Sequence, residues 1–200
     1  MEEKIQFSAS DLLIRQITPE DSIDLASFSC GDNPEYNELN HFFQSSDIFL
    51  CAKYHYYSVY VVRHRVTSEL LAVFTLANDT ILLKTKDEKE DLTEEVRPVV
   101  ADEYNEIWDQ QTSYPAIVIG HLGVCSRYQS SHIGSILIGF ILTTFEKYNI
   151  TGCQFITVDA LNNQGTNKFY LREGFSYLTN TDSMSSTRRM YMPLNCVKNG

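Results

Sequence analysis

A short polar turn between a predicted strand and a predicted helix is the segment of this sequence best suited to bind an anion. The apolar run 114–124 predicts a buried strand, and a helix is predicted from Gly134 or Ser135 to about Tyr148. Between them lies segment 129–135, Gln-Ser-Ser-His-Ile-Gly-Ser. The first N–H groups of a helix have no partner within the helix and lie at the positive end of its dipole. We therefore expect phosphate groups to bind at this helix start.

Histidine and cysteine are the other residue types that could transfer protons or act as nucleophiles. His121 lies within the predicted central strand, where it could serve as a general base or be buried as a hydrogen-bonded core group. The five cysteines are scattered and include no Cys-x-x-Cys pair, which indicates neither a disulfide framework nor a zinc site. We expect buried or idle thiols and no metal site.

The elements that must position these residues follow from the apolar patterns. Runs 57–64 and 70–77, joined by the polar link 65–69, predict a β-hairpin. Strands come first along the chain and then alternate with helices, which favours a mixed sheet with helices on both faces. The full set of predicted strands is 11–17, 57–64, 70–77, 114–124, 154–160 and 189–194, and the predicted helices are 20–28, 35–43, 134–148 and 162–172.

Two segments in this order resemble the motifs of the GCN5-related N-acetyltransferases, the GNAT superfamily. The first motif of that superfamily is a strand followed by Q/R-x-x-G-x-G/A, and this chain has Gln129-Ser-Ser-His-Ile-Gly134. The second is a helix with the pattern N-x-x-A-x-x-F-Y-x-x-x-G-F. It is matched by Asn163, Phe169, Tyr170, Gly174 and Phe175, with Thr166 at the alanine position. A shorter N-terminal similarity, Cys30-Gly31 and Leu39-Asn40-x-Phe42, is to the subgroup that includes tRNA-acetylating toxins.

The resemblance implies a single N-acetyltransferase domain over 1–200, with an α/β GNAT-like fold whose twisted central sheet is mostly antiparallel and flanked by helices. It also implies acetyl-CoA as the bound coenzyme. Asn163 is expected to contact the pantetheine arm, and Arg127 either contacts a phosphate or forms a surface ion pair. The remaining residues expected to bind the coenzyme are Leu122, Gly123 and Val124 on the strand edge and Gln129, Ser130, Ser131, His132, Ile133, Gly134 and Ser135 in the turn.

The chemistry implied by the resemblance is direct attack of a primary amine on the thioester. Tyr170 occupies the usual general-acid position, and its phenol, with an ordinary pKa near ~10, stays protonated at neutral pH and can donate to the leaving thiolate. The alternative is an aromatic residue packed in the core. The N–H of Val124 is expected to donate to the oxyanion, and His121 is the candidate base.

One residue departs from the family pattern. His132 stands where the superfamily usually has its first glycine. If the backbone there needs a positive φ, a non-glycine residue costs on the order of 1 kcal/mol. His132 would then either weaken coenzyme binding or offset the cost by donating to a phosphate.

The whole-chain composition limits the partners. A formal net charge of -10 weighs against extended contact with nucleic acid or a membrane surface, and no apolar run is long enough for a signal peptide or a membrane span. We therefore predict a cytoplasmic protein that acts on a small or peptide amine, and a homodimer is left open. Toxin-type acetylation of aminoacyl-tRNA and a non-catalytic CoA-binding module are the alternatives. Residues 86–110 are rich in carboxylates and predict a solvated, partly helical insertion, or an entrance for a cationic amine.

Overall fold

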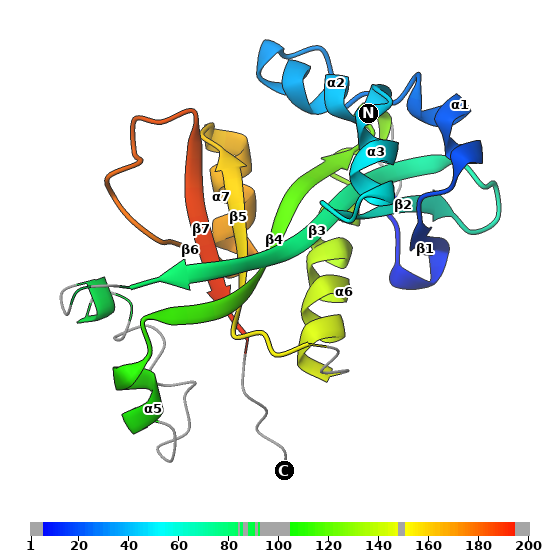
Figure 1. Cartoon of the computed structure of the whole chain (residues 1–200). Helices are drawn as coiled ribbons and strands as arrows, with labels where there is room; N and C mark the ends of the chain where they lie inside the picture. The colour runs from blue at the N-terminus through cyan, green and yellow to red at the C-terminus, as the bar shows by residue number, and fades with distance from the viewer. Residues whose placement is uncertain are drawn as a thin grey trace. The chain divides into compact units, whose positions relative to one another are not determined.

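Seven strands form one sheet in this computed structural model, which describes residues 6–83, 85, 88–90, 92, 105–147 and 151–194 (Figure 1). They are hydrogen-bonded in the order β1-β2-β3-β4-β5-β7-β6. The pairs β1–β2, β2–β3, β5–β7 and β6–β7 are antiparallel. The predicted mixed α/β class with a mostly antiparallel sheet is confirmed. The strands are β1 Leu12–Gln16, β2 Ser58–His64, β3 Leu70–Leu82, β4 Ser113–Val124, β5 Phe155–Leu161, β6 Ser176–Tyr177 and β7 Thr187–Pro193.

Six helices have bounds within the described residues. The long helix that follows β4 is α6, Ile133–Lys147, and the short helix that follows β5 is α7, Gln164–Arg172. None of the described helices is long and apolar enough to cross a membrane. The remaining helices are α1 Ser22–Leu25, α2 Asn37–Gln44, α3 Asp47–Lys53 and α5 Asn105–Gln110.

The chain divides into two compact units that interleave along the sequence. The first unit consists of Met1–Ala77 and Ile119–Gly139, and the second of Asn78–Val118 and Phe140–Gly200. The first contains β1, β2, most of β3 and the end of β4, and the second contains β5, β6, β7 and the remainder of β3 and β4. The single domain expected over 1–200 stays a prediction.

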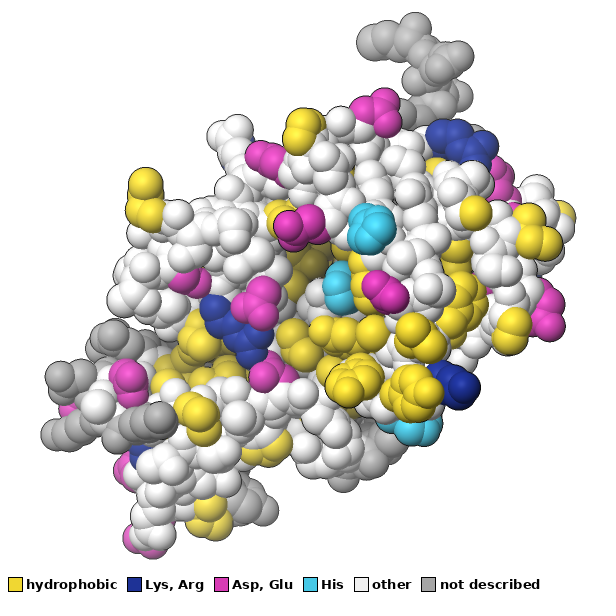
Figure 2. Space-filling model, turned by 45° about the horizontal axis from the view of Figure 1, so that its top comes forward, with side chains coloured by type: hydrophobic (Ala, Val, Ile, Leu, Met, Phe, Trp, Pro, Cys, Tyr) yellow, Lys and Arg dark blue, Asp and Glu magenta, His cyan; other side chains and the backbone are white. Residues whose placement is uncertain are grey.

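Most arginines of the described residues are engaged with carboxylates. In the first unit, Arg15 and Arg63 both bind the buried Asp21, each with an N–O distance of 2.7 Å. In the second unit, Arg188 binds Asp182 at 2.7 Å. On the face drawn in Figure 2, the basic side chains lie as separate spots among acidic ones. Part of the positive charge of the chain is therefore used to hold its own loops and strands.

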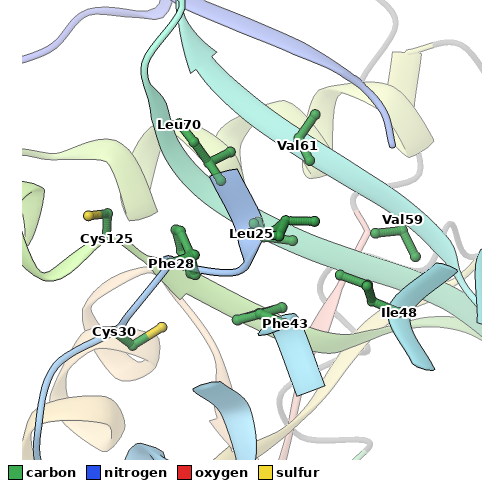
Figure 3. Close-up of a cluster of buried hydrophobic side chains, with 10 residues drawn as sticks. Leu25, Phe28, Cys30, Phe43, Ile48, Val59, Val61, Leu70 and Cys125 are labelled. Carbon is green, nitrogen blue, oxygen red and sulfur yellow. The ribbon is translucent and has the colours of Figure 1, made fainter. Parts of the chain in front are cut away.

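The core of the first unit lies under α1, α2 and α3 and is shown in Figure 3. Phe43 on α2 and Ile48 on α3 are fully buried, and Phe28 meets the Phe43 ring edge-on with 5.4 Å between centroids. The apolar residues of α2 recur at helical spacing, which explains why the sequence predicted this helix. The helix α3 was not predicted, although it supplies Ile48 to the same core.

The core of the second unit is built around Trp108, Tyr114, Phe155 and Tyr191. The Tyr114 hydroxyl donates to the backbone oxygens of Trp108 and Gln111, both at 2.9 Å. Trp108 is only 4% exposed, so the described end of the acidic insertion is packed rather than solvated, because its indole ring fills this core. Most of segment 86–110 lies outside the described residues, and so does any entrance that it would line.

Strand β3 continues five residues beyond the end predicted at Ala77. The sequence Asn78-Asp79-Thr80 has the composition of a turn, but Asp79 accepts hydrogen bonds from Thr157 on β5 and Arg189 on β7. These partners are far away in the sequence, so a local pattern could not indicate them. The short strand β6 was not predicted either.

Candidate functional site

The end of β4 is packed too closely for side chains at its glycines. A Cβ on Gly123 would lie 2.5 Å from the Phe43 ring and 2.6 Å from the Cys30 sulfur. Glycine therefore lets α2 and the Cys30 loop reach the backbone of the strand, next to Leu122 and Val124. Burial raises the pKa of the Cys30 thiol to about 12, with Cys125 adding a smaller contribution, so this thiol is not a nucleophile at neutral pH.

Two side chains expected at the coenzyme instead hold the loop that follows β4. The Gln129 amide donates to the backbone oxygens of Cys30 at 2.6 Å and Val124 at 3.3 Å. The buried Ser131 donates through its hydroxyl to the backbone carbonyl oxygen of Tyr128. The backbone of the loop, rather than these two side chains, is left to meet an anion.

The loop contains two left-handed residues that are not glycine. Ser130 has a φ of 65° and His132 a φ of 67°. Left-handed backbone costs an L-residue about 1–2 kcal/mol, so the strain that His132 was expected to suffer is present. Alternating backbone handedness aims successive N–H groups at one point and forms an anion-binding nest.

Helix α6 starts immediately after His132, whose carbonyl accepts from the Ile136 N–H at 3.0 Å. The N–H groups of Ile133 and Gly134 belong to the first turn of α6, and N–H groups in a first turn have no acceptor within the helix itself. Gly134 and Ser135 are half-buried, and the His132 side chain is exposed. This helix start, preceded by the two left-handed residues, has the chemistry of a diphosphate cradle.

Arg127 forms a surface ion pair. Its guanidinium lies 2.8 Å from a Glu69 oxygen and covers the Tyr128 ring, and its side chain is 68% exposed. Of the two alternatives for Arg127, the structure shows the surface ion pair.

His121 lies in an aromatic cage formed by residues of the first unit. Its ring stacks on Phe42 with 3.9 Å between centroids and meets the edge of Tyr57 at 5.3 Å. Its Nδ1 is 3.1 Å from the hydroxyl oxygen of the buried Thr75. Burial lowers the pKa of His121 to about 4, so the imidazole is neutral at pH 7 and only weakly basic. This environment favours the packed, hydrogen-bonded alternative over a strong general base.

Thr75 and Phe42 were not expected at the site. Phe42 was noted only as part of the N-terminal similarity, and Thr75 lies inside a continuous buried run on β3. A single hydroxyl in such a run gives no local signal, because its importance comes from a histidine 46 residues away.

The second motif forms α7 in the other unit. Asn163 caps this helix, since its side-chain oxygen accepts from the Thr166 N–H at 2.8 Å. At the opposite end, the Phe175 N–H donates to the backbone carbonyl oxygen of Tyr170, and the Gly174 N–H donates to the backbone carbonyl oxygen of Leu171. This is a Schellman motif, and Gly174 supplies its left-handed residue with a φ of 96°.

Tyr170 is held by that motif. Its ring meets the Phe175 ring edge-on, with 5.2 Å between centroids, and this is the apolar contact that accompanies a Schellman motif. The Phe169 ring lies on another side, with 5.0 Å between centroids. The residue is 5% exposed, and burial raises the pKa of its phenol above the usual value. Among the described residues, no group is hydrogen-bonded to the phenol oxygen. The Tyr170 phenol is therefore fixed and protonated, and it has no hydrogen-bond partner among the described residues.

Comparison with known proteins adds a structural relationship. No protein-family model matches this sequence, and no curated protein matches it. Among solved structures, a tyrosine-to-phenylalanine mutant of KacT is similar with a TM-score of 0.67 and 20% identity over 92% of this chain and 95% of that chain. A mutant of the AtaT toxin is similar with a TM-score of 0.68 and 17% identity, covering 98% and 97%. The chain has the GNAT fold.

A third similar structure is AtaT in complex with acetyl-methionyl-tRNAfMet, with a TM-score of 0.66 and 18% identity over 92% of this chain and 95% of that one. Of these proteins, AtaT is described as a toxin. Within the GNAT fold, the first motif occupies the end of β4, the following loop and the start of α6. The second motif occupies α7. Each motif is thus formed inside one compact unit.

Proposed function

We propose that this protein is an N-acetyltransferase that transfers an acetyl group from acetyl-CoA to a primary amine. The observation that carries the proposal is the loop with left-handed backbone at Ser130 and His132, which leads directly into the first turn of α6 in a chain with the GNAT fold. Backbone strain of about 1–2 kcal/mol per residue persists at functional sites, where it preorganises ligand contacts.

The residues present fit coenzyme A. The α6 start suits the diphosphate. The side-chain amide nitrogen of Asn163 is buried and has no hydrogen-bond partner among the described residues, as expected for a group that binds a ligand. When bound, acetyl-CoA would supply the thioester from which the acetyl group is taken. The backbone of Leu122, Gly123 and Val124 would hold the pantetheine arm as an added strand would.

Tyr170 acts as the general acid in this proposal. It holds its proton at the phenol oxygen and donates it to the departing thiolate, while the amine forms the new bond to the acetyl carbon and loses its own proton to solvent or His121. The N–H of Val124 stabilises the negative charge that develops on the acetyl oxygen. The reaction requires the α6 start and Tyr170 to engage the same ligand.

The weak basicity of His121 bears on the acceptor. A base with a pKa of about 4 is poorly matched to a lysine ammonium, whose ordinary pKa is about 10.4. An α-amino group, with an ordinary pKa of about 8, is already partly neutral at pH 7 and needs little help. An α-amine is therefore the favoured acceptor.

Tyr170→Phe tests the proposal. The variant should fold and bind coenzyme A much as the wild type does, because the hydroxyl has no hydrogen-bond partner among the described residues whose loss would disturb the structure, and its kcat for acetylation should fall about a hundredfold or more. Tyr56→Phe, at an exposed tyrosine, is the matched control and should keep full activity. The measurement is thiol release with α-amine and ε-amine acceptors. Coenzyme binding without turnover on any amine would leave a non-catalytic CoA-binding module.

Aminoacyl-tRNA is a second candidate acceptor. It offers an α-amine. One of the similar structures is AtaT in complex with acetyl-methionyl-tRNAfMet, and the similarity covers 92% of this chain. The net charge of -10 and the paired arginines oppose it, because tRNA binding normally relies on a basic face. Filter binding with aminoacyl-tRNA at low salt distinguishes this acceptor from small or peptide α-amines. If the protein has no affinity for aminoacyl-tRNA there, small or peptide α-amines are the remaining candidate acceptors.

A further inference from the structure

His121 is held by a buried hydroxyl group that has no part in the reaction proposed above. The His121 Nδ1 lies 3.1 Å from the side-chain oxygen of Thr75, which is fully buried on β3. Gly120 makes room for this contact, because a Cβ there would lie 2.9 Å from the Thr75 hydroxyl and 2.5 Å from the Tyr57 ring. All of these residues belong to the first unit. The position of the imidazole is therefore set by tertiary contacts inside one unit.

The Thr75 hydroxyl determines which imidazole nitrogen carries the proton. Among the described residues, this hydroxyl has no other hydrogen-bond partner, so Nδ1 is the only acceptor for its proton. A buried hydroxyl that donates to nothing costs about 1–3 kcal/mol, so the hydroxyl donates and Nδ1 accepts. A neutral imidazole carries its proton on one nitrogen and accepts through the other. The proton of neutral His121 is therefore on Nε2.

The Nε2–H group of His121 has no acceptor among the described residues. His121 is half-buried, and Nε2 does not belong to the described side-chain atoms that are both buried and unpaired, so this edge of the ring reaches solvent. The rings of Phe42 and Tyr57 surround it, and burial lowers its pKa without a contribution from any charged group. A neutral donor among aromatic rings suits an uncharged oxygen, because a carboxylate there would lose its hydration.

We infer that His121 donates a hydrogen bond through Nε2–H to a carbonyl oxygen of a bound substrate, and that Thr75 is the positioning residue that fixes this tautomer. The inference rests on the proposed function, because His121 precedes the expected oxyanion donor Val124 by three residues, roughly 10 Å along an extended strand. The oxygen can belong to the acyl acceptor or to the acetyl group. The amine then loses its proton to solvent, since the accessible nitrogen of His121 is already protonated.

Nitrogen NMR of the full chain at about pH 8, where histidine is neutral, tests the tautomer without any substrate. The Nε2 of His121 should have the chemical shift of a protonated nitrogen and Nδ1 that of an unprotonated one. His64 is the internal reference, because its Nδ1 accepts from the Thr67 backbone N–H at 3.2 Å. Thr75→Val should shift the His121 signals toward a mixture of tautomers, and Thr75→Ser should keep them as in the wild type. A proton on Nδ1 of wild-type His121 would overturn the inference.

Acetylation of alanine amide and of isopropylamine, which lacks the carbonyl group, identifies the oxygen. His121→Phe keeps the aromatic stack on Phe42 but has no N–H group in the ring. If the oxygen belongs to the acceptor, this variant should raise the KM for alanine amide about tenfold and leave the KM for isopropylamine unchanged. If the oxygen belongs to the acetyl group, kcat should fall about tenfold with both amines.

His121→Gln separates a hydrogen-bond donor from a base. Glutamine offers an N–H group but does not take up a proton at neutral pH, so this variant should recover most of what His121→Phe loses. Thr67→Val is the matched control, because it removes the hydroxyl of a second histidine–threonine pair, in which the His64 Nδ1 lies 2.8 Å from the Thr67 oxygen. It should have the kinetic constants of the wild type.

Equal losses in His121→Gln and His121→Phe would overturn the inference, and so would an unchanged KM and kcat in His121→Phe. The proposed function fails separately, through a wild-type protein that neither binds coenzyme A nor releases thiol with any amine. In that case the nitrogen NMR spectrum still decides the tautomer of His121.

Discussion

At the level of single residues, two of the four described non-glycine residues with a positive φ lie next to the expected phosphate position, and the other two, His55 and Ser68, lie in other turns. Ser130 and His132 are both left-handed, and neither is glycine. The exposed His132 side chain is held by no hydrogen bond among the described residues, so packing does not account for its conformation. The His132 carbonyl accepts from the Ile136 N–H at the start of α6, but the side chain has no such role, so we expect it to contact a ligand.

Replacement of His132 by glycine separates strain from ligand contact. The variant should raise the free energy of unfolding by about 1 kcal/mol or less, because relief of the left-handed penalty is partly offset by the greater freedom of glycine in the unfolded chain. Urea unfolding measures this effect, with Ser130→Gly as the matched control. If the imidazole donates to a phosphate, His132→Gly also binds coenzyme A more weakly, whereas unchanged or tighter binding would show that it does not.

His121 gives a pH dependence of stability. Its pKa is about 4 in the folded protein and about 6.5 when unfolded, so the unfolded state takes up the proton first as the pH falls. The stability associated with a neutral His121 is fully present above about pH 6.5 and is lost between about pH 6.5 and pH 4. In urea unfolding at about pH 7.5 and about pH 5, wild type should therefore lose more stability than His121→Gln. Equal losses in the two proteins would contradict this assignment.

At the scale of elements, α7 is the helix whose two ends are best defined. Asn163 begins it and the Schellman motif at Gly174 ends it, so the rotation of the helix and the direction of Tyr170 are fixed from both sides. The contact between Tyr170 and Phe175 belongs to that ending. The position of the proposed proton donor thus depends on a glycine four residues away.

Gly174→Ala tests this dependence. At a φ of 96°, a Cβ is strained, and the variant should lose about 1 kcal/mol or more of unfolding free energy. Because Tyr170 is held by the same motif, kcat should fall further than the loss of folded protein explains. Gly139→Ala, at a helical glycine whose Cβ would meet nothing, is the control and should be neutral or slightly stabilising. Wild-type kcat in a destabilised Gly174→Ala protein would show that the motif does not position the tyrosine.

At the scale of the whole molecule, the two motifs belong to two compact units joined by the shared strands β3 and β4. The proposed reaction needs one ligand to engage both. Coenzyme A stabilises the conformation that it binds, so the amides that it contacts should exchange more slowly with solvent in its presence.

Hydrogen exchange therefore provides a test across the molecule. Coenzyme A should slow exchange both at the start of α6, around Ile133 and Gly134, and in the first turn of α7. Phosphoadenosine diphosphate, without the pantetheine arm, should slow only the α6 amides. Protection confined to α6 with full-length coenzyme A would separate the diphosphate site from Tyr170 and contradict the proposed mechanism.

Local patterns in the sequence determined much of this protein. The order of strands and helices, the hairpin of β2 and β3, the glycine ending of α7 and the two GNAT motifs are all encoded by neighbouring residues. Strand alternation, helical spacing and turn chemistry act over a few residues, so a single sequence is sufficient to detect them.

The tertiary structure alone decided the roles that depend on distant partners. It assigned the Gln129 side chain to the Cys30 carbonyl, buried Trp108 in a core, extended β3 through Asp79, and placed His121 against Phe42 and Thr75. Burial, the pKa of a histidine and the unpaired state of an amide are set by atoms that folding brings together from far along the chain. The sequence shows which polar and titratable side chains the protein has. Only the tertiary structure determines which of these side chains remain available to bind a ligand.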